Sequence, residues 1–264
     1  MNKKSLSKKN HSLKSVRQIN LLQLYPDDMN IYGDFGNSEI ISKRLSLYGY
    51  KVNLLKYNSF KDRANLLKAD IILGGGGQDS GQKIILDDLQ LIKDDIIKLA
   101  KKKVPMLMIC GLYQLFGKEF ILSDGSSLAG VGLFDLVTKA GSKRLIGNAI
   151  CDTEWGQLIG YENHSGLTSL NEGQSALGYV IKGYGNNGKD RSEGAVKYNV
   201  FGSYLHGPIL AKNTAFADHL ILKAINLKFN EKKLQTKDKE SAAILDTIDR
   251  ISKEARLVAA SRPQ

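Results

Sequence analysis

Cys110 is the residue whose surroundings most clearly suggest chemistry. A short apolar run, Met106 to Ile109, ends at this cysteine, and Gly111 and a segment with helical spacing follow it. Apolar strand, reactive residue, glycine and helix form the arrangement in which a chain presents a nucleophile on a sharp turn. The partial positive charge at the start of the helix favours the thiolate over the thiol. Taken alone, however, Cys110 is better interpreted as a buried structural cysteine.

A second unusual turn follows another short apolar run, Ile71 to Leu73. Four glycines in succession, Gly74 to Gly77, stand there. They lack the Lys-Ser/Thr of a P-loop and the G-x-G-x-x-G spacing of a dinucleotide site, so support for nucleotide binding is weak. A turn that donates backbone amides to an oxyanion is the better functional interpretation, and a purely structural turn is the alternative.

The segments around these turns alternate between strand and helix. We expect strands at residues 19–24, 51–57, 71–73 and 106–109, with helices at 38–48 and 85–99 between them. This alternation predicts an α/β fold with a mostly parallel sheet that has helices on both faces. Ligands bind beyond the carboxyl ends of the strands in such sheets, and both the glycine turn and Cys110 lie at those ends.

The second half of the chain has a different pattern. Residues 120–180 read as short strands and turns, and residues 183–194 form a long polar loop. A strand at residues 195–204 then leads into L-H-G-P, which contains His206, and a helix is expected at 215–227. The imidazole of His206 therefore also follows a strand.

Composition limits the classes of protein that need to be considered. The chain has 264 residues, 42% of them hydrophobic, which suits one domain with a sizeable core. No apolar run approaches the roughly 20 residues of a membrane span, and the basic start leads into no secretory apolar region. Two cysteines form no disulfide framework or metal pattern, which fits a reduced cytoplasm. The net charge of +11 favours anionic partners, but no RNA-binding pattern of aromatic and basic residues occurs, so we expect no nucleic acid.

Charge also divides the chain into three parts. Residues 1–17 are a basic tail that we expect to be disordered, and residues 18–228 form the main domain. Residues 229–264 are a charged tail in which apolar residues recur at helical spacing, which suggests a terminal helix, either docked or loose.

Several segments resemble a known family. I-C-G-L-Y-Q-L-F-G at 109–117 resembles the nucleophile turn of class I, triad-type glutamine amidotransferases, and S-Y-L-H-G-P at 203–208 is similar to the histidine segment of their CobB/CobQ-like branch. The segments at 25–37, 160–168 and 185–188 are more narrowly similar to the glutaminase subunits of lipid II isoglutaminyl synthases. The resemblance covers about residues 18–228 and implies the flavodoxin-like fold of class I glutaminases.

The resemblance also implies a reaction. Ammonia released from L-glutamine would pass to a Mur-ligase-like, ATP-binding subunit, with which this chain would form a heterodimer. That partner would amidate the D-glutamate α-carboxyl of the lipid II stem peptide, a step of peptidoglycan biosynthesis. We expect no cofactor or metal on this chain, since ATP and magnesium would belong to the partner. A cytoplasmic location, with possible peripheral contact between the basic chain and the anionic inner face of the membrane, follows.

The same resemblance gives roles to individual residues. Cys110 would attack the glutamine side-chain carbonyl, and His206 would transfer the protons. The Gly111 amide and an amide from the Gly75–Gly76 turn would bind the oxyanion. Arg144, in R-L-I-G-N, would bind the substrate α-carboxylate through its guanidinium fork. An ordinary surface arginine is the alternative for that residue.

The family pattern is incomplete in one place. Many class I enzymes carry a glutamate two residues after the histidine, but this chain has Pro208 there. The orienting carboxylate must therefore be missing or come from elsewhere, and Glu162 is the nearest candidate by motif. His164 is the strongest rival base, although a core or turn role is favoured for it. Three other residues have no supporting context: His11, Cys151 and His219.

Two other functions stay open at this point. A glutaminase for cobyrinate or cobyrate amidation is one, although those synthases usually carry an ATP-binding half with a P-loop, and no P-loop occurs here. A non-catalytic binding module that has kept the fold is the other, and the intact cysteine and histidine segments argue against it.

Overall fold

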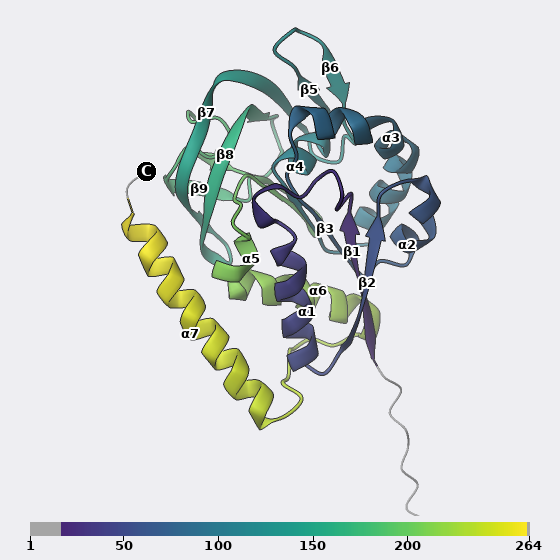
Figure 1. Cartoon of the computed structure of the whole chain (residues 1–264), viewed down its shortest axis with the longest axis vertical. Helices are drawn as coiled ribbons and strands as arrows, with labels where there is room; N and C mark the ends of the chain where they lie inside the picture. The colour runs from purple at the N-terminus through teal and green to yellow at the C-terminus, as the bar shows by residue number, and fades with distance from the viewer. Residues whose placement is uncertain (1–16, 263–264) are drawn as a thin grey trace, which may run out of the picture.

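A central six-stranded sheet organises the computed structural model, which describes residues 17–262. The basic tail predicted for residues 1–17 therefore lies outside the described residues except for Arg17. The strand order is β11-β12-β4-β3-β1-β2, and Figure 1 labels three of its strands, β3, β1 and β2. Its parallel strands are β1 (Gln18–Leu24), β2 (Lys51–Tyr57), β3 (Ile71–Gly74), β4 (Met106–Ile109) and β12 (Val200–Ser203), and β11 (Ala195–Lys197) runs antiparallel at one edge.

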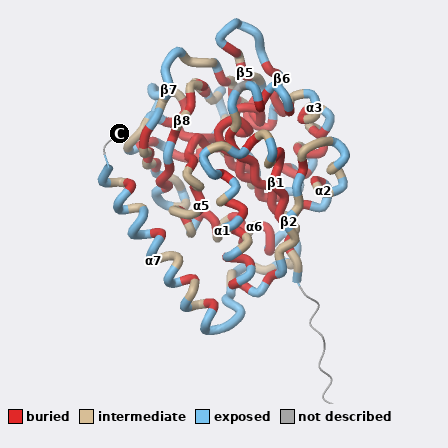
Figure 2. The backbone as a smooth tube through the Cα atoms, viewed as in Figure 1, coloured by how far each residue is buried: buried red, intermediate tan, exposed pale blue. Residues whose placement is uncertain are grey.

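The middle of this sheet is buried on both faces. Every residue of β3 and of β4 is buried (Figure 2), as continuous apolar runs in a covered parallel sheet require. The connections from β1 to β2 and from β3 to β4 run in opposite directions along the sheet. Right-handed crossovers therefore place α1 (Gly36–Leu47) and α3 (Asp79–Lys101) on opposite faces. The predicted α/β class, with a mostly parallel sheet and helices on both faces, is confirmed.

One further long helix and several short elements complete the layers. α6 (Thr214–Phe229) packs beside α1. The remaining short elements are η1 (Ile31–Gly33), η2 (Phe60–Asp62), α2 (Arg63–Leu67), α4 (Gly111–Leu115) and α5 (Ile209–Lys212).

A second sheet corrects the prediction of only short strands between residues 120 and 180. Its order is β10-β9-β7-β5-β6, and β8 pairs with β7. β7 (Leu136–Thr153) and β8 (Gly156–Leu170) form a hairpin of long strands. The other members are β5 (Glu119–Ile121), β6 (Ser127–Ala129), β9 (Gly178–Lys182) and β10 (Ser192–Glu193). The register shifts between Ala140 and Leu145, and this irregularity, together with several glycines, conceals the alternation that identifies a strand.

The single strand expected at residues 195–204 is also wrong. Tyr198 adopts a positive φ of 58°, and the chain turns there. β11 and β12 therefore form an antiparallel hairpin, and the second strand alone enters the parallel sheet. The tight turn at a tyrosine rather than a glycine explains why the sequence reads as one strand.

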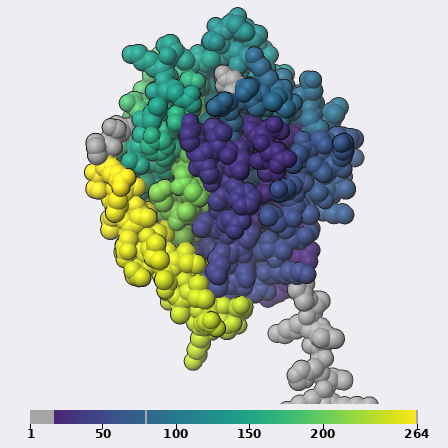
Figure 3. Space-filling model, in the orientation of Figure 1, coloured from purple at the N-terminus to yellow at the C-terminus, as the bar shows by residue number. Residues whose placement is uncertain are grey.

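The charged segment at the C-terminal end contains a docked helix, α7 (Lys239–Ser261), which lies along one side of the molecule (Figure 3). Arg44 of α1 is buried beneath it and donates hydrogen bonds to Asp218 of α6 (2.6 Å) and Asp249 of α7 (2.7 Å). Because a buried guanidinium needs such partners, these contacts join three helices. The helix is thus docked rather than loose.

Candidate active site

Cys110 stands at the turn that the sequence predicts. β4 ends at Ile109, α4 begins at Gly111, and Cys110 between them has φ 49° and ψ −101°. A positive φ at a residue with a Cβ is strained, and such strain is typical of functional turns. Since α4 has only five residues, its dipole contributes only a small part of the electrostatic stabilisation that a thiolate would need.

His206 lies directly against this cysteine. It follows β12 and is held by a bridge to Tyr161, whose N–H donates to the His206 carbonyl while the His206 N–H donates to the Tyr161 carbonyl. A Cβ added at Gly76 would lie 2.7 Å from His206 Cε1 and 3.2 Å from Cys110 Cβ. Both side chains therefore lie within a few ångströms of one point above the glycine turn, and only a glycine leaves room there.

Asp34 completes the group. Its carboxylate accepts a hydrogen bond from His206 Nδ1, with distances of 3.1 Å to Oδ1 and 3.0 Å to Oδ2. Burial lowers the pKa of His206, but the hydrogen-bonded Asp34 carboxylate and the neighbouring Cys110 sulfur outweigh it and raise the pKa to about 10. At neutral pH His206 is therefore an imidazolium between two groups that can carry negative charge, the order found in cysteine hydrolases.

The glycine turn differs from its predicted role at one residue. The Gly76 N–H donates to Asp34 Oδ2 at 2.8 Å, so it is not free to bind an oxyanion in this conformation. The Gly77 nitrogen, in contrast, is 2.9 Å from the position that a Cβ on Gly111 would occupy. The Gly111 amide is the first of α4 and has no partner within the helix. Gly75 and Gly111 stay predicted contributors to the oxyanion hole, and Gly77 becomes a further candidate.

Arg144 and Cys110 line the same hollow. Most of the other residues that line the hollow are polar or small, and two are apolar: Ile31, Tyr32, Gly77, Gln78, Ser80, Gln114, Phe120, Asn163, His164, Ser165 and Gly166. Among the side chains that the structure describes, none that lines this hollow is acidic, and the Arg144 guanidinium adds a positive charge suited to a carboxylate. The structure thus brings Cys110, His206 and Arg144 together from three separate segments.

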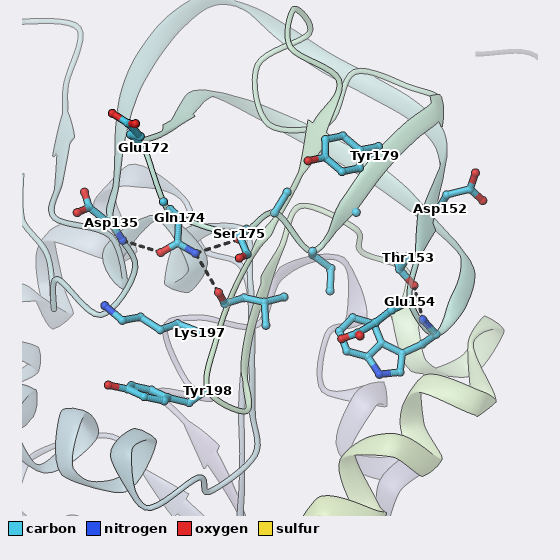
Figure 4. Close-up of a pocket in the computed structure, with 16 residues that line it drawn as sticks. Asp135, Asp152, Thr153, Glu154, Glu172, Gln174, Ser175, Tyr179, Lys197 and Tyr198 are labelled. Carbon is cyan, nitrogen blue, oxygen red and sulfur yellow. Dashed lines mark hydrogen bonds between the residues drawn. The ribbon is translucent and has the colours of Figure 1, made fainter.

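A larger open hollow lies elsewhere on the molecule (Figure 4). Acidic and tyrosine side chains surround it, among them Asp135, Asp152, Glu172, Tyr179 and Tyr198. It contains neither Cys110 nor His206 nor Arg144. Its size therefore does not make it the place of the predicted chemistry.

Comparison with known proteins agrees with this geometry. Residues 20–214 match the CobB/CobQ-like glutamine amidotransferase domain. The chain belongs to the CobB/CobQ-like glutamine amidotransferase family. The resemblance predicted from the motifs is confirmed.

Two relatives match this family member over most of their own length. The lipid II isoglutaminyl synthase (glutamine-hydrolyzing) subunit GatD of Staphylococcus aureus is 36% identical over 81% of this chain and 87% of that protein. The subunit of the same name in Streptococcus pneumoniae is 36% identical over 81% of this chain and 83% of that protein. A probable cobyric acid synthase of Methanococcus maripaludis is 30% identical over 76% of this chain but only 41% of that protein.

Solved structures support the fold alone. A glutamine amidotransferase crystal structure aligns with a TM-score of 0.55 at 15% identity, covering 77% of this chain and 98% of that one. The glutaminase domain of Trypanosoma brucei CTPS aligns at 0.50 with 10% identity, over 84% of this chain and 98% of that one.

In this amidotransferase the orienting carboxylate comes from Asp34, which sequence reasoning missed. The Glu162 carboxylate instead accepts N–H groups from Tyr184 (2.7 Å) and Gly185 (2.9 Å), so that candidate is replaced. The sequence signal for Asp34 was the density of Asp, Asn and Gly in residues 25–37. This segment follows the carboxyl end of β1, and Cys110 lies at the same edge of the sheet.

Of the remaining candidates, His164 lines the same hollow as Cys110, whereas Cys151 and His219 do not. His164 is buried, stacks on Tyr204 at 3.5 Å, and donates from Nδ1 to the Gly166 carbonyl at 2.8 Å. Burial lowers its pKa to about 4, so His164 is neutral at pH 7 and has a core role. Burial also raises the pKa of Cys151, which keeps that thiol protonated. His219 packs against Trp155, and His11 lies outside the described residues.

Glu193 is a buried acid that fixes the segment leading to His206. Its Oε1 accepts hydrogen bonds from Ser203 Oγ (2.7 Å) and the Tyr204 N–H (2.9 Å), while Oε2 has no partner among the described residues. Burial raises its pKa from 4.5 to about 7, despite these hydrogen bonds. The folded state therefore holds the Glu193 proton more tightly than the unfolded state does.

This proton gives a prediction for stability. The contribution of protonated Glu193 is present below about pH 4.5 and is lost as pH rises towards 7. Between pH 5 and 8 we expect the wild-type chain to lose about 2–3 kcal/mol more unfolding free energy than Glu193→Gln. Denaturant titrations of both chains at pH 5, 6.5 and 8 measure the difference. Parallel pH curves would contradict the prediction, whatever the absolute stability of the variant.

Proposed function

We propose that this chain is the glutaminase subunit of a lipid II isoglutaminyl synthase. It releases ammonia from L-glutamine, and a Mur-ligase-like partner uses ATP to place that ammonia on the D-glutamate α-carboxyl of the lipid II stem peptide. The contact of Cys110 with a His206–Asp34 pair in an amidotransferase fold carries the first half of this proposal. The near full-length match to two GatD subunits supports the second half.

The first chemical step follows from the charge on His206. With a pKa of about 10, His206 is an imidazolium at neutral pH, and a cation beside Cys110 favours attack by the sulfur as a thiolate. The thiolate attacks the side-chain carbonyl carbon of glutamine, and the electrons move onto the oxygen, where backbone amides stabilise them. His206 already holds the proton that departing ammonia requires. The carbon–nitrogen bond then breaks and leaves a glutamyl thioester on Cys110.

The second step needs a base. Once the Cys110 sulfur is acylated it has lost its negative charge, so one of the two causes of the raised His206 pKa has been removed. The imidazole, now without its proton, can take one from water, which attacks the thioester. Glutamate leaves and the thiolate–imidazolium pair forms again. Asp34 fixes the tautomer throughout, because its carboxylate accepts the Nδ1 proton.

The chemistry of ammonia, the product, favours a partner subunit that receives it directly. Ammonia lost to water would be protonated and wasted, so a second subunit should cover or adjoin the mouth of the hollow. ATP and magnesium belong to that subunit in this proposal. This chain matches only 41% of the length of the cobyric acid synthase, so cobyrate amidation is the weaker assignment. The contact of Cys110 with His206 and Asp34 disfavours a non-catalytic module.

Ammonia release tests the proposal. We expect weak hydrolysis of glutamine by the isolated chain and a severalfold or larger increase when its Mur-ligase-like partner is co-expressed. Amidation of lipid II by the pair, with glutamine as donor, is the expected product assay. Glutamine turnover with no amidated lipid II, but with an amidated corrinoid, would overturn the assignment of the substrate.

Charge on one end of the central sheet supports a cytoplasmic location beside the anionic inner face of the membrane. Exposed cationic residues lie where strands begin and where α3 and α6 end, opposite the edge that carries Cys110. They are Arg17, Lys51, Lys68, Lys101, Lys102, Lys103, Lys228, Lys232 and Lys233. Asp70 and Glu231, the acidic residues there, pair with Lys228 and Arg17. None of the helices in residues 17–262 is long and apolar enough to cross a membrane.

Vesicle binding tests this contact. We expect Lys101→Glu combined with Lys102→Glu to weaken sedimentation with phosphatidylserine vesicles roughly tenfold or more at low salt, since each lysine near an anionic surface contributes about 1 kcal/mol. Lys189→Glu combined with Lys253→Glu, which changes the same net charge elsewhere, is the matched control. Equal weakening by both pairs would show that only net charge matters, and the contact surface would then be wrong.

A further inference from the structure

Arg144 stands on an exposed segment of β7, beside the register shift between Ala140 and Leu145. None of the carboxylates whose side chains the structure describes forms an ion pair with it. An exposed arginine without such a partner would sample many rotamers, and binding a ligand would then cost the conformational entropy of its side chain. Some other contact is needed if Arg144 is to be ready for a substrate.

Asn163, across the hairpin on β8, makes that contact. Its Oδ1 accepts a hydrogen bond from Arg144 Nε at 2.8 Å, and its Nδ2 donates to the Tyr32 hydroxyl at 2.8 Å. Because an arginine can only donate, the amide must turn its oxygen to Arg144 and its nitrogen to Tyr32. Both ends of the amide are satisfied, so its orientation is determined.

Tyr32 connects this contact to the catalytic group. Its φ is 56°, in the left-handed region, and its ring meets that of His206 edge to face at 5.0 Å. Residues 30–34 also carry Asp34, which binds His206. The Arg144–Asn163–Tyr32 chain therefore links the arginine on the hairpin to the imidazole above Cys110.

We propose that Asn163 is a positioning residue for glutamine recognition. It holds the Arg144 guanidinium through Nε and leaves both terminal nitrogens free to form the fork that binds the α-carboxylate. Tyr32 keeps the Asn163 amide turned the correct way and sets the distance between that fork and His206. The inference rests on the proposed glutaminase activity and concerns how its substrate is selected.

A double-mutant cycle tests this role. With the chain in complex with its partner, we expect Asn163→Ala to raise KM for glutamine roughly tenfold and to change kcat less than about threefold. Arg144→Ala is expected to raise KM roughly a hundredfold. If Asn163 acts through Arg144, the double variant will match Arg144→Ala alone, because the first change has nothing left to orient.

Two further variants sharpen the result. Tyr32→Phe keeps the ring on His206 but removes the hydroxyl, and should raise KM less than Asn163→Ala does. Asn148→Ala, on the same face of the hairpin, should leave KM unchanged. Additive effects in the double variant, or a fall in kcat without a rise in KM, would overturn the proposal. Failure of the wild-type complex to release ammonia would instead refute the glutaminase function itself.

Discussion

Replacing Cys110 with alanine is expected to reduce ammonia release from glutamine by about 10⁵–10⁶-fold, to the background of the assay. The sulfur is the atom that forms the thioester, and no other thiol can replace it, because Cys151 is buried and its pKa is raised. Substitution by alanine keeps the Cβ at this strained turn, so the fold and glutamine binding should persist. The expected change is thus in kcat.

Cys151→Ala is the matched control, since it removes the other cysteine and should keep activity within about threefold. A glutamine-like electrophile should label wild-type Cys110 and the Cys151→Ala chain in the presence of the partner, and should fail to label Cys110→Ala. Substantial ammonia release by Cys110→Ala would mean that a different nucleophile performs the reaction.

The nucleophile turn could be predicted because its signals are local. Met106 to Ile109, Cys110 and Gly111 are adjacent in sequence, and the buried strand, strained turn and helix follow from those residue types. His206 could be predicted for the same reason, since a strand precedes it in the sequence. Both lie at carboxyl ends of parallel strands, so topology alone brings them to the same edge of the sheet.

Asp34 shows what local signals cannot reveal. It is 172 residues from its partner His206, and in sequence it looks like one turn residue among several. Its role depends on how residues 30–34 lie over the glycine turn, where Ile31 N–H donates to the Gly76 carbonyl. The same contact turns the Gly76 N–H towards Asp34, and for this reason the oxyanion prediction failed at that glycine.

The long strands were missed, and the docking of the terminal helix was left open, for related reasons. The β7–β8 hairpin contains an irregularity that breaks the two-residue alternation, and the positive φ of Tyr198 divides a segment that reads as one strand. Docking of α7 depends on the buried Arg44, whose acidic partners lie on two other helices. Such pairings depend on tertiary structure, and neither hydrophobic period nor helix propensity reports them.

Asp34→Asn is expected to lower kcat/KM for glutamine by about 10⁴-fold, the size of effect that follows loss of the orienting carboxylate from a catalytic triad. The asparagine oxygen can still accept from the Gly76 N–H, so the turn should keep its shape. Towards His206, however, the uncharged amide no longer stabilises the imidazolium, while burial continues to lower the His206 pKa. The positive charge of His206 beside Cys110 therefore loses its main support.

The pH dependence distinguishes this cause from simple misfolding. In the wild-type chain, His206 stays protonated until pH approaches its raised pKa of about 10. The rate at which a glutamine-like electrophile labels Cys110 should therefore show no transition from loss of the His206 proton below about pH 9. In Asp34→Asn the same transition should move at least two pH units lower, because the pKa of His206 falls. Asp27→Asn, an exposed neighbour in the same loop, should leave the profile unchanged. A variant at Asp34 with nearly full activity and an unshifted profile would show that His206 is oriented without this carboxylate, and the triad would reduce to Cys110 and His206.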